Sequence, residues 1–185
     1  MKRRWTENAD IALYAVLAIW AAYILNYLVL PLEFTAYGIR PRSISGLWGI
    51  LFCPFLHGNL AHITANTIAL FVLLTLSLSF SRRLTLFALF AIVAGGGGIV
   101  WLLGDFRTVY IGASGIVFGL IGFLIGIGLF RREWPAVVFT AVVFILYGGA
   151  LLSLLRTRPG TNWLAHASGI AVGTMSAWSS RMDRT

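Results

Sequence analysis

Thiols, histidines and charged side chains are scarce in this sequence, and each shortage excludes a class of protein. The single cysteine, Cys53, allows neither an internal disulfide nor a cysteine metal site, and we interpret it as a small buried packing residue. Three histidines and six acidic residues supply no ligand set with the spacing of a metal centre, so no metal and no cofactor is expected. Charged residues make up only 11% of the chain and hydrophobic residues 59%, which would leave a soluble domain with too much apolar surface.

Long apolar runs dominate what is present. A helix needs about 20 mostly apolar residues to cross a bilayer. Six runs have that character: Ile11–Leu30, Leu60–Phe80, Leu84–Gly104, Ser114–Phe130, Ala136–Leu155 and Asn162–Ser179. The sequence therefore predicts an all-α fold, a polytopic membrane protein built as a six-transmembrane-helix bundle. The first run is too long for the apolar core of a signal peptide.

The apolar runs predict one membrane domain between two short tails. We expect a cytoplasmic tail over residues 1–10, a single six-helix domain over residues 11–180 and a C-terminal tail over residues 181–185. The first loop, about residues 31–56, is long, and we expect it to be partly helical and to lie at the membrane interface. The sequence carries no signal that specifies an oligomeric state.

The net charge of +8 lies in the short connections between the apolar runs. No basic stripe with interleaved aromatic residues is present, so nucleic acid is not an expected partner. In an alternating bundle nine basic residues share the side of the termini: Lys2, Arg3, Arg4, Arg82, Arg83, Arg131, Arg132, Arg181 and Arg184. The other five are Arg40, Arg42, Arg107, Arg156 and Arg158. This bias favours cytoplasmic termini. The membrane that we expect is a prokaryotic plasma membrane.

Polar residues stand near the beginning of three apolar runs. His62, Ser114 and His166 lie near the starts of the second, fourth and sixth runs. Because helices alternate in direction, these three runs enter the membrane from the same side, and the three side chains share one depth. Polar groups inside a bilayer are costly and tend to face an interior cavity. The sequence therefore predicts a polar cavity near one membrane surface.

Small residues at helical spacing predict which helices meet at that cavity. The fourth run carries Gly115, Gly119, Gly122 and Gly126, and the sixth carries Gly169 and Gly173. Spacings of this kind allow two membrane helices to pack closely. Generic membrane packing also explains any one pair, but two such faces favour a contact that would bring Ser114 near His166.

The residues at these helix starts are suited to hydrolysis of a carbonyl compound. Ser114, flanked by glycines in Gly112-Ala113-Ser114-Gly115, becomes a nucleophile if His166 takes its proton. The developing oxyanion needs hydrogen-bond donors. His62 and Asn66 share one helix face, and the Ser114 backbone N–H adds a donor at the positive end of a helix.

Each of these residues also has a structural interpretation. Ser114 alone is suited to cap a helix. His166 alone is consistent with a hydrogen-bonded core histidine, and Asn66 with a contact between helices. His62 alone fits an interfacial histidine or a proton relay.

His57 and Asp105 are two further polar residues near these helix starts. His57 lies five residues before His62 and off its face, so we expect a structural role rather than a ligand. A metal site from His57, His62 and His166 has no carboxylate or thiolate at supporting spacing. Asp105 could orient His166 as a third member of a triad, but its neighbour Arg107 favours a solvated ion pair.

Taken together, the chain resembles the rhomboid family of intramembrane serine proteases, in its minimal six-transmembrane form. The matching segments are His57-Gly-Asn-Leu-Ala-His62-Ile-Thr-Ala-Asn66, Gly112-Ala-Ser114-Gly115 and Ala165-His166-Ala-Ser-Gly169-Ile-Ala-Val-Gly173. The resemblance implies a catalytic dyad of Ser114 and His166, with no acid. It implies an oxyanion hole formed by His62, Asn66 and the Ser114 N–H. Supporting positions are Gly112, Gly115, Phe118, Gly169, Gly173 and His57, with Phe118 stacked on the catalytic histidine.

The first loop departs from the family pattern. Many rhomboids carry a Trp-Arg pair there, whereas this loop offers Gly38-Ile39-Arg40-Pro41-Arg42 and Trp48. The resemblance implies that the substrates are membrane proteins, cut in or near their transmembrane segments. Two alternatives stay open: an inactive relative that binds membrane clients, which the presence of Ser114 and His166 disfavours, and a transporter, which the lack of an inverted repeat disfavours.

Overall fold

The computed structural model describes residues 2–29, 33–131, 133–153 and 162–180. Within these residues the chain is helical, and its extended pairing is confined to an isolated antiparallel bridge between Ile39 and Tyr110. The predicted tail at residues 181–185 and the arginines at 132, 156, 158, 181 and 184 lie outside the described residues.

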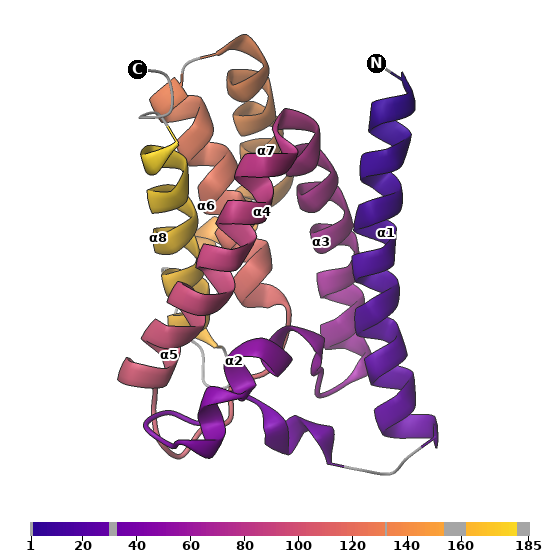
Figure 1. The fold of residues 1–185 in the computed structure, drawn as a ribbon, viewed down its shortest axis with the longest axis vertical. Coiled ribbons are helices and arrows are strands. Elements are labelled where there is room, and N and C mark those ends of the chain that lie inside the picture. Colours follow the sequence, from indigo (N-terminus) through magenta and orange to yellow (C-terminus); the bar gives the residue numbers. More distant parts are fainter. Residues whose placement is uncertain (1, 30–32, 132, 154–161, 181–185) are drawn as a thin grey trace.

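Six long helical segments form the bundle in the described part of the chain (Figure 1). They are α1 (Lys2–Ile24) with the π-helical turn η1 (Leu25–Val29), α3 (Leu60–Phe80), α4 (Arg82–Ala91) continued by η5 (Ile92–Gly96) and α5 (Gly97–Leu103), α6 (Ser114–Arg131), α7 (Trp134–Ser153) and α8 (Trp163–Ser179). Five are long and apolar enough to cross a membrane, and α8 is shorter, at 17 residues. The predicted polytopic helical membrane bundle is confirmed.

The N-terminal boundary differs from the prediction. Residues 2–10, predicted as a cytoplasmic tail, are helical, because α1 begins at Lys2. Polar contacts hold its first turns against the turn between α3 and α4. Asn8 is fully buried, donates to Ser79 Oγ at 3.1 Å and accepts from Arg82 Nε at 2.7 Å, while Glu7 pairs with Arg82 at 2.8 Å. The polar side chains that suggested a tail therefore attach the helix to the bundle.

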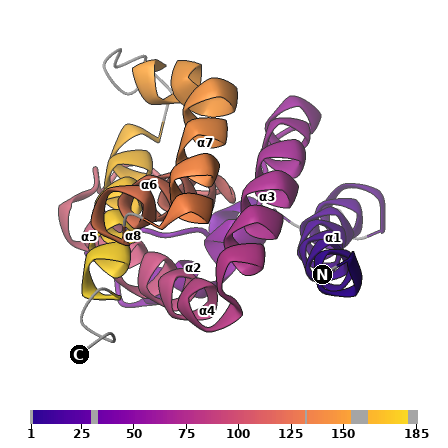
Figure 2. The ribbon, with the colours of Figure 1, turned by 90° about the horizontal axis from the view of Figure 1, so that it is seen from above.

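The tightest contact in the bundle joins α6 and α8, as the glycine spacing predicts. A Cβ atom at Gly169 would collide with the carbonyl oxygen of Gly115, and one at Gly173 with that of Gly119. Only glycine permits this approach of two backbones. Seen along the bundle, α6 is an inner helix, whereas α1 lies at one edge beyond α3 (Figure 2).

The first loop forms a cap over the α5 end of the bundle. It contains η2 (Phe34–Tyr37), η3 (Ser45–Leu47), α2 (Gly49–Phe52) and η4 (Cys53–Phe55), so it is partly helical, as predicted. Ile39 and Tyr110 exchange both backbone hydrogen bonds at 2.9 Å. The Arg42 N–H donates to Trp101 O at 2.9 Å, and its guanidinium to the Leu102 carbonyl at 3.1 Å.

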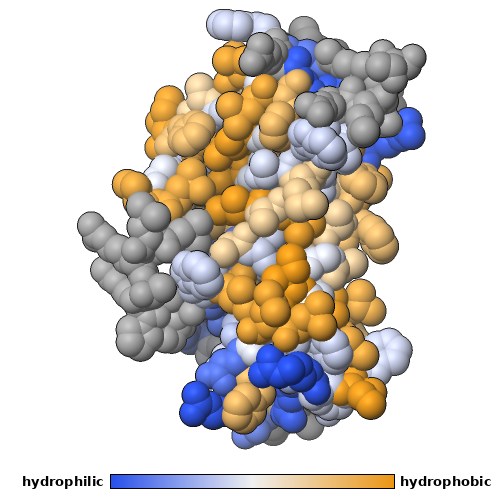
Figure 3. Space-filling model, turned by 90° about the vertical axis from the view of Figure 1, so that its left-hand side faces the viewer, coloured by the Kyte–Doolittle hydropathy of each residue, from blue (hydrophilic) through white to orange (hydrophobic). Residues whose placement is uncertain are grey.

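The Trp101 indole returns a hydrogen bond to the loop, to the carbonyl of Ser43 at 2.8 Å. An arginine and a tryptophan thus anchor the loop, although they are not adjacent in sequence: Arg42 lies in the loop and Trp101 in α5. The surface beyond this cap is apolar along the middle of the bundle and hydrophilic near the loop end, as a membrane protein requires (Figure 3).

Candidate active site

Ser114 and His166 meet at the loop end of the bundle. Ser114 is the first residue of α6, and His166 lies in the first turn of α8. The Nε2 atom of His166 lies 2.9 Å from the Oγ atom of Ser114, which is hydrogen-bond distance. The glycine contact between α6 and α8 brings these two residues together across 52 positions of sequence.

An aromatic ring fixes the orientation of the His166 imidazole. Phe118, one turn after Ser114 on α6, stacks on it with ring centroids 4.2 Å apart and an interplanar angle of 15°. Phe118 is itself buried, so the core holds the stacked pair. The stacking that the family resemblance implies is present.

The turn before Ser114 requires glycine. Gly112 has φ +113°, a conformation that L side chains rarely adopt. A Cβ atom there would also lie 2.6 Å from both Cε1 and Nε2 of His62. The His62 ring therefore packs directly on the backbone that leads into Ser114, and the three polar residues predicted to share one depth do gather there.

His57 holds the same turn from the other side. Its Nε2 atom accepts the Ala113 N–H at 3.4 Å, and its Nδ1–H donates to the Phe55 carbonyl at 3.4 Å. Acceptance at Nε2 requires a neutral ring that carries its proton on Nδ1. Burial, and secondarily the neighbouring His62, lower the pKa of His57 to about 4. The two rings meet edge-on at 4.9 Å between centroids, so His57 supports the His62 ring as well as the turn.

Asn66 is buried in α3, one turn after His62. Its side-chain N–H donates to the His62 carbonyl at 3.1 Å, while Asn59 caps the helix by accepting the His62 N–H at 2.8 Å. Both bonds stiffen the turn that carries His62. The bond made by Asn66 is thus internal to α3, and its role as an oxyanion donor stays a prediction.

Asp105 pairs with Arg107, as its sequence context suggests. The Arg107 Nε lies 3.3 Å from the Asp105 carboxylate, and both side chains are exposed. Hydrogen bonds from the backbone and side chain of Arg107 lower the pKa of Asp105. Asp105 is therefore engaged in the loop rather than oriented on His166. Among the described residues no group of three His, Cys, Asp or Glu side chains is arranged to hold a metal ion.

Sequence comparison identifies the family to which this arrangement belongs. The Rhomboid domain family model matches residues 45–182, which include each residue of the site described above. The chain belongs to the rhomboid family.

Individual relatives of this rhomboid include several bacterial proteins. An uncharacterized protein of Mycobacterium tuberculosis is 41% identical over 152 residues, covering 76% of this chain and 62% of the relative. One of Mycobacterium leprae is 38% identical, with 76% and 59% covered. "Putative rhomboid protease YdcA" of Bacillus subtilis is 29% identical over 170 residues, with 88% and 82% covered. The chain thus spans about three fifths of the length of these mycobacterial relatives.

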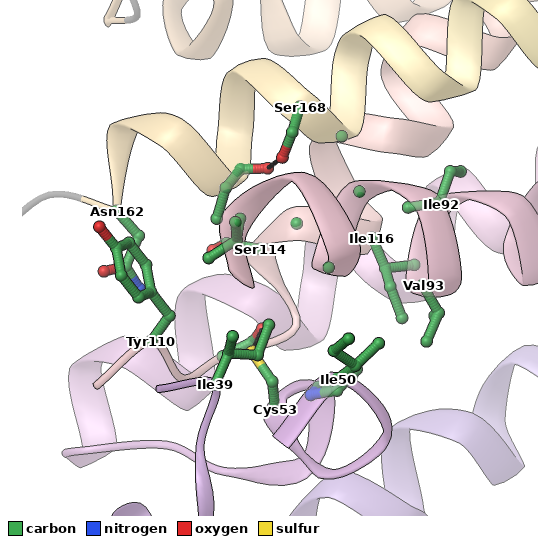
Figure 4. Close-up of a pocket in the computed structure, with 18 of the residues that line it drawn as sticks. Ile39, Ile50, Cys53, Ile92, Val93, Tyr110, Ser114, Ile116, Asn162 and Ser168 are labelled. Atoms are coloured by element: carbon green, nitrogen blue, oxygen red, sulfur yellow. Dashed lines mark hydrogen bonds between the residues drawn. The ribbon is translucent and has the colours of Figure 1, made fainter. Parts of the chain in front are cut away.

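A narrow cavity opens beside Ser114 in this rhomboid. Ile39, Ile50 and Cys53 of the first loop lie on one side, and α8 with Ser168 on the other, with Ser114 between them (Figure 4). The volume of about 40 Å³ is enough for about three water molecules. Glycines of η5, α5, α6 and α8 form much of the remaining wall. A small side chain fits such a space better than a large one.

Three further residues shape the site, and their contacts could not be read from sequence motifs. Asn162, just before α8, donates to the Ile111 carbonyl at 2.9 Å and so ties the start of α8 to the turn before Ser114. The Cys53 carbonyl accepts the Gly112 N–H at 2.8 Å. Burial raises the pKa of the Cys53 thiol to about 12, consistent with the predicted packing role. Tyr27 of η1 donates to the Gly58 carbonyl at 3.0 Å and links this turn to the segment that carries His57.

Proposed function

We propose that this rhomboid is an intramembrane serine protease that cuts membrane proteins in or near their transmembrane segments. The observation that carries the proposal is the 2.9 Å contact between His166 Nε2 and Ser114 Oγ. A serine hydroxyl is a weak nucleophile unless an adjacent base takes its proton. His166 is that base, and its stacking on Phe118 supports a single ring orientation.

The reaction proceeds in two halves. The Ser114 Oγ forms a bond to the scissile carbonyl carbon as its proton passes to His166 Nε2, giving a tetrahedral oxyanion. The imidazolium returns that proton to the amide nitrogen, the C–N bond breaks, and the amine product leaves an acyl-serine. Water then attacks the ester, His166 takes a proton from the water and returns it to Ser114, and the acid product departs.

Donors for the oxyanion come from two helix starts. The Ser114 N–H belongs to the first turn of α6, where backbone N–H groups have no acceptor within the helix. The His62 ring lies against Gly112, two residues before Ser114, which supports its role as a second donor. Asn66 acts as a further donor through the side-chain N–H that the His62 carbonyl does not use.

The Ser114 hydroxyl gives a direct test. We expect a fluorophosphonate probe to label the purified protein, and Ser114→Ala and His166→Ala each to abolish both labelling and cleavage of a model transmembrane substrate. The matched control is Ser176→Ala, which removes a buried hydroxyl from α8 ten residues after His166. Labelling or cleavage that persists in folded Ser114→Ala protein would refute the proposal and favour a relative that only binds clients.

The substrate must expose a peptide bond that a helix normally hides. Carbonyls in a transmembrane helix are hydrogen-bonded to N–H groups four residues on, so the helix has to unwind before attack. The small glycine-lined cavity beside Ser114 supports a small residue just before the cut. We therefore expect preference for substrates with Gly, Pro or polar residues at the site-proximal end of their helix.

A substrate series in proteoliposomes tests this selectivity. Replacing the helix-destabilising residues by leucine should slow cleavage, and a large residue just before the cut should slow it further. Equal rates across the series would show that neither unwinding nor the cavity selects the substrate. The cytoplasmic placement of the termini remains a prediction, which reporter fusions to the two ends would test.

A further inference from the structure

A second, larger cavity lies at the end of the bundle away from Ser114. The start of α1, the turn between α3 and α4, the end of α6 and the start of α7 gather at this end (Figure 1). The cavity has a volume of about 410 Å³, which lies within the usual range for sites that bind small molecules. We call it the arginine pocket, after Arg4 and Arg131 in its wall. The proposed protease chemistry makes no use of it.

The two arginines of the pocket are held differently. Arg131 is largely buried, with 14% of its side chain exposed, and is fixed by Glu133 at 3.2 Å and by the Phe80 ring at 5.7 Å. Arg4 has no ion-pair or hydrogen-bond partner among the described residues. The described residues of its wall include two cations and one carboxylate, a net charge of +1, and leave one guanidinium free to bind an anion.

The part of the pocket wall formed by Asn8, next to Arg4 on α1, is polar and held in place by hydrogen bonds. Asn8, one turn after Arg4 on α1, is fully buried and is held by both Ser79 and Arg82. Its two hydrogen bonds fix the distance between α1 and the turn after α3. The pocket is therefore formed before any ligand arrives, which lowers the entropic cost of binding.

The remaining wall is aromatic and faces the apolar part of the bundle. Trp5 meets Phe139 of α7 edge-on at 6.2 Å between ring centroids and is 42% exposed. Tryptophan favours the level of the lipid headgroups, where one side of its ring is wet and the other apolar. Farther along α1, toward the membrane centre, Leu13 and Leu17 are exposed, and the first turns of α7 expose Val137 and Val138.

We propose that the arginine pocket binds the phosphate headgroup of an anionic phospholipid, whose acyl chains lie along α1 and α7. A guanidinium recognises phosphate oxygens through charge-assisted hydrogen bonds. The aromatic and aliphatic side chains next to the arginines favour a lipid over free phosphate, because only a lipid has acyl chains that can pack against them. The bound lipid bridges α1 and α7.

Lipid retention measured by native mass spectrometry tests the proposal. The full chain is purified in detergent micelles that contain equal amounts of dioleoyl phosphatidylglycerol and dioleoyl phosphatidylcholine. We expect the wild-type protein to retain phosphatidylglycerol preferentially. Arg4→Gln should weaken that retention about tenfold, as expected for loss of a charge-assisted hydrogen bond. Arg4→Lys should keep most of it because the charge remains.

Arg83→Gln is the matched control, since it removes one exposed cation from the same end of the bundle without touching the pocket. Arg83→Gln should retain the lipid as the wild type does. An equal loss in both glutamine variants, or in Arg4→Lys and Arg4→Gln, would overturn the proposal, as would equal retention of the two lipids. Displacement of the lipid by millimolar inorganic phosphate would assign the pocket to a soluble anion instead. Because the readout is lipid binding, these outcomes do not depend on proteolysis.

Discussion

Helices α6 and α7 follow one another in the chain and have similar hydropathy, yet they occupy different environments. Their membrane segments have mean hydropathies of 1.9 and 2.2, but 56% of the α6 segment is buried inside the protein against 11% of the α7 segment. Hydrophobicity therefore does not decide which helix becomes the interior one. In a bilayer this is expected, because lipid tails are as apolar as a leucine side chain.

The glycines of the two regions explain the difference. On α6 and α8 they face backbone: a Cβ atom at Gly122 would approach Ile170, and one at Gly173 would strike Gly119. On α7, Gly148 and Gly149 have nothing within 4 Å of a built Cβ atom. Glycine creates an interior contact only where a second helix presents a matching small surface. The Ser114–His166 pair sits on the helices that have this match.

A methyl group added at the contact between α6 and α8 should destabilise the protein, whereas one added to α7 should not. We expect the substitution at the α6–α8 contact to have the largest effect. Gly173→Ala places its Cβ against the Gly119 backbone, which cannot move aside as a flexible side chain can. We expect a loss of about 3 kcal/mol in stability, at the upper end for overpacking. Because α8 must move away from α6, the distance between His166 and Ser114 grows and probe labelling of Ser114 should fall sharply.

Gly149→Ala is the matched control in the open helix. The new methyl group meets no neighbour, and alanine favours a helix over glycine by about 1 kcal/mol. Thermal unfolding in detergent should therefore show unchanged or raised stability, with normal labelling. Equal destabilisation by the two substitutions would mean that the α6–α8 contact is no tighter than the surroundings of α7.

Much of the α6–α8 pair could be predicted from the sequence. The glycine spacing gave the contact between the helices, and alternation of the helices gave the shared level of His62, Ser114 and His166. Both follow from helix geometry and from the cost of polar groups in lipid, which depend on local sequence. The stacking of Phe118 was expected from the family resemblance alone.

The connections that hold the site could not be predicted in the same way. The bond from Asn162 to the Ile111 carbonyl and that from Ala113 to His57 join a side chain to a backbone group, and the sequence shows no partner for either. The anchoring of the first loop by Arg42 and Trp101 depends on segments about 60 residues apart. The start of α1 at Lys2 could not be predicted either, because Glu7 and Asn8 bind Arg82, which lies 75 and 74 residues further along the chain.

The turn before Ser114 is held by the hydrogen bond from the Ala113 N–H to His57. The stability of the fold should therefore depend on pH through the titration of His57. The folded-state pKa of His57, about 4, lies below the ordinary value of 6.5. Above pH 6.5 the ring is neutral in both states, so its contribution to stability is fully present. As the pH falls below 6.5 the unfolded state gains a proton that the folded state excludes, so stability declines toward pH 4.

His57→Gln isolates this contribution, since the Gln side-chain oxygen can accept the Ala113 N–H but does not titrate. We expect the melting temperature of the wild type to fall more steeply between pH 7.5 and pH 4 than that of the variant. His62 and His166 remain in both proteins, so their titration is common to the two curves. Parallel curves would show that His57 does not hold the turn through its neutral ring.

The smallest effect should come from the polar contact between α6 and α7. Thr140 of α7 donates its hydroxyl to the Leu124 carbonyl of α6 at 2.8 Å. Thr140→Val keeps the shape and removes the donor, and hydrogen bonds between membrane helices are worth about 0.6 kcal/mol on average. The unfolding transition should shift slightly, while labelling of Ser114 should stay at the wild-type level, because the dyad depends on α8 and not on α7. A loss of labelling comparable to that of Gly173→Ala would show that α7 also sets the geometry of Ser114. The contacts of α6 with α7 and with α8 would then both determine the position of the nucleophile.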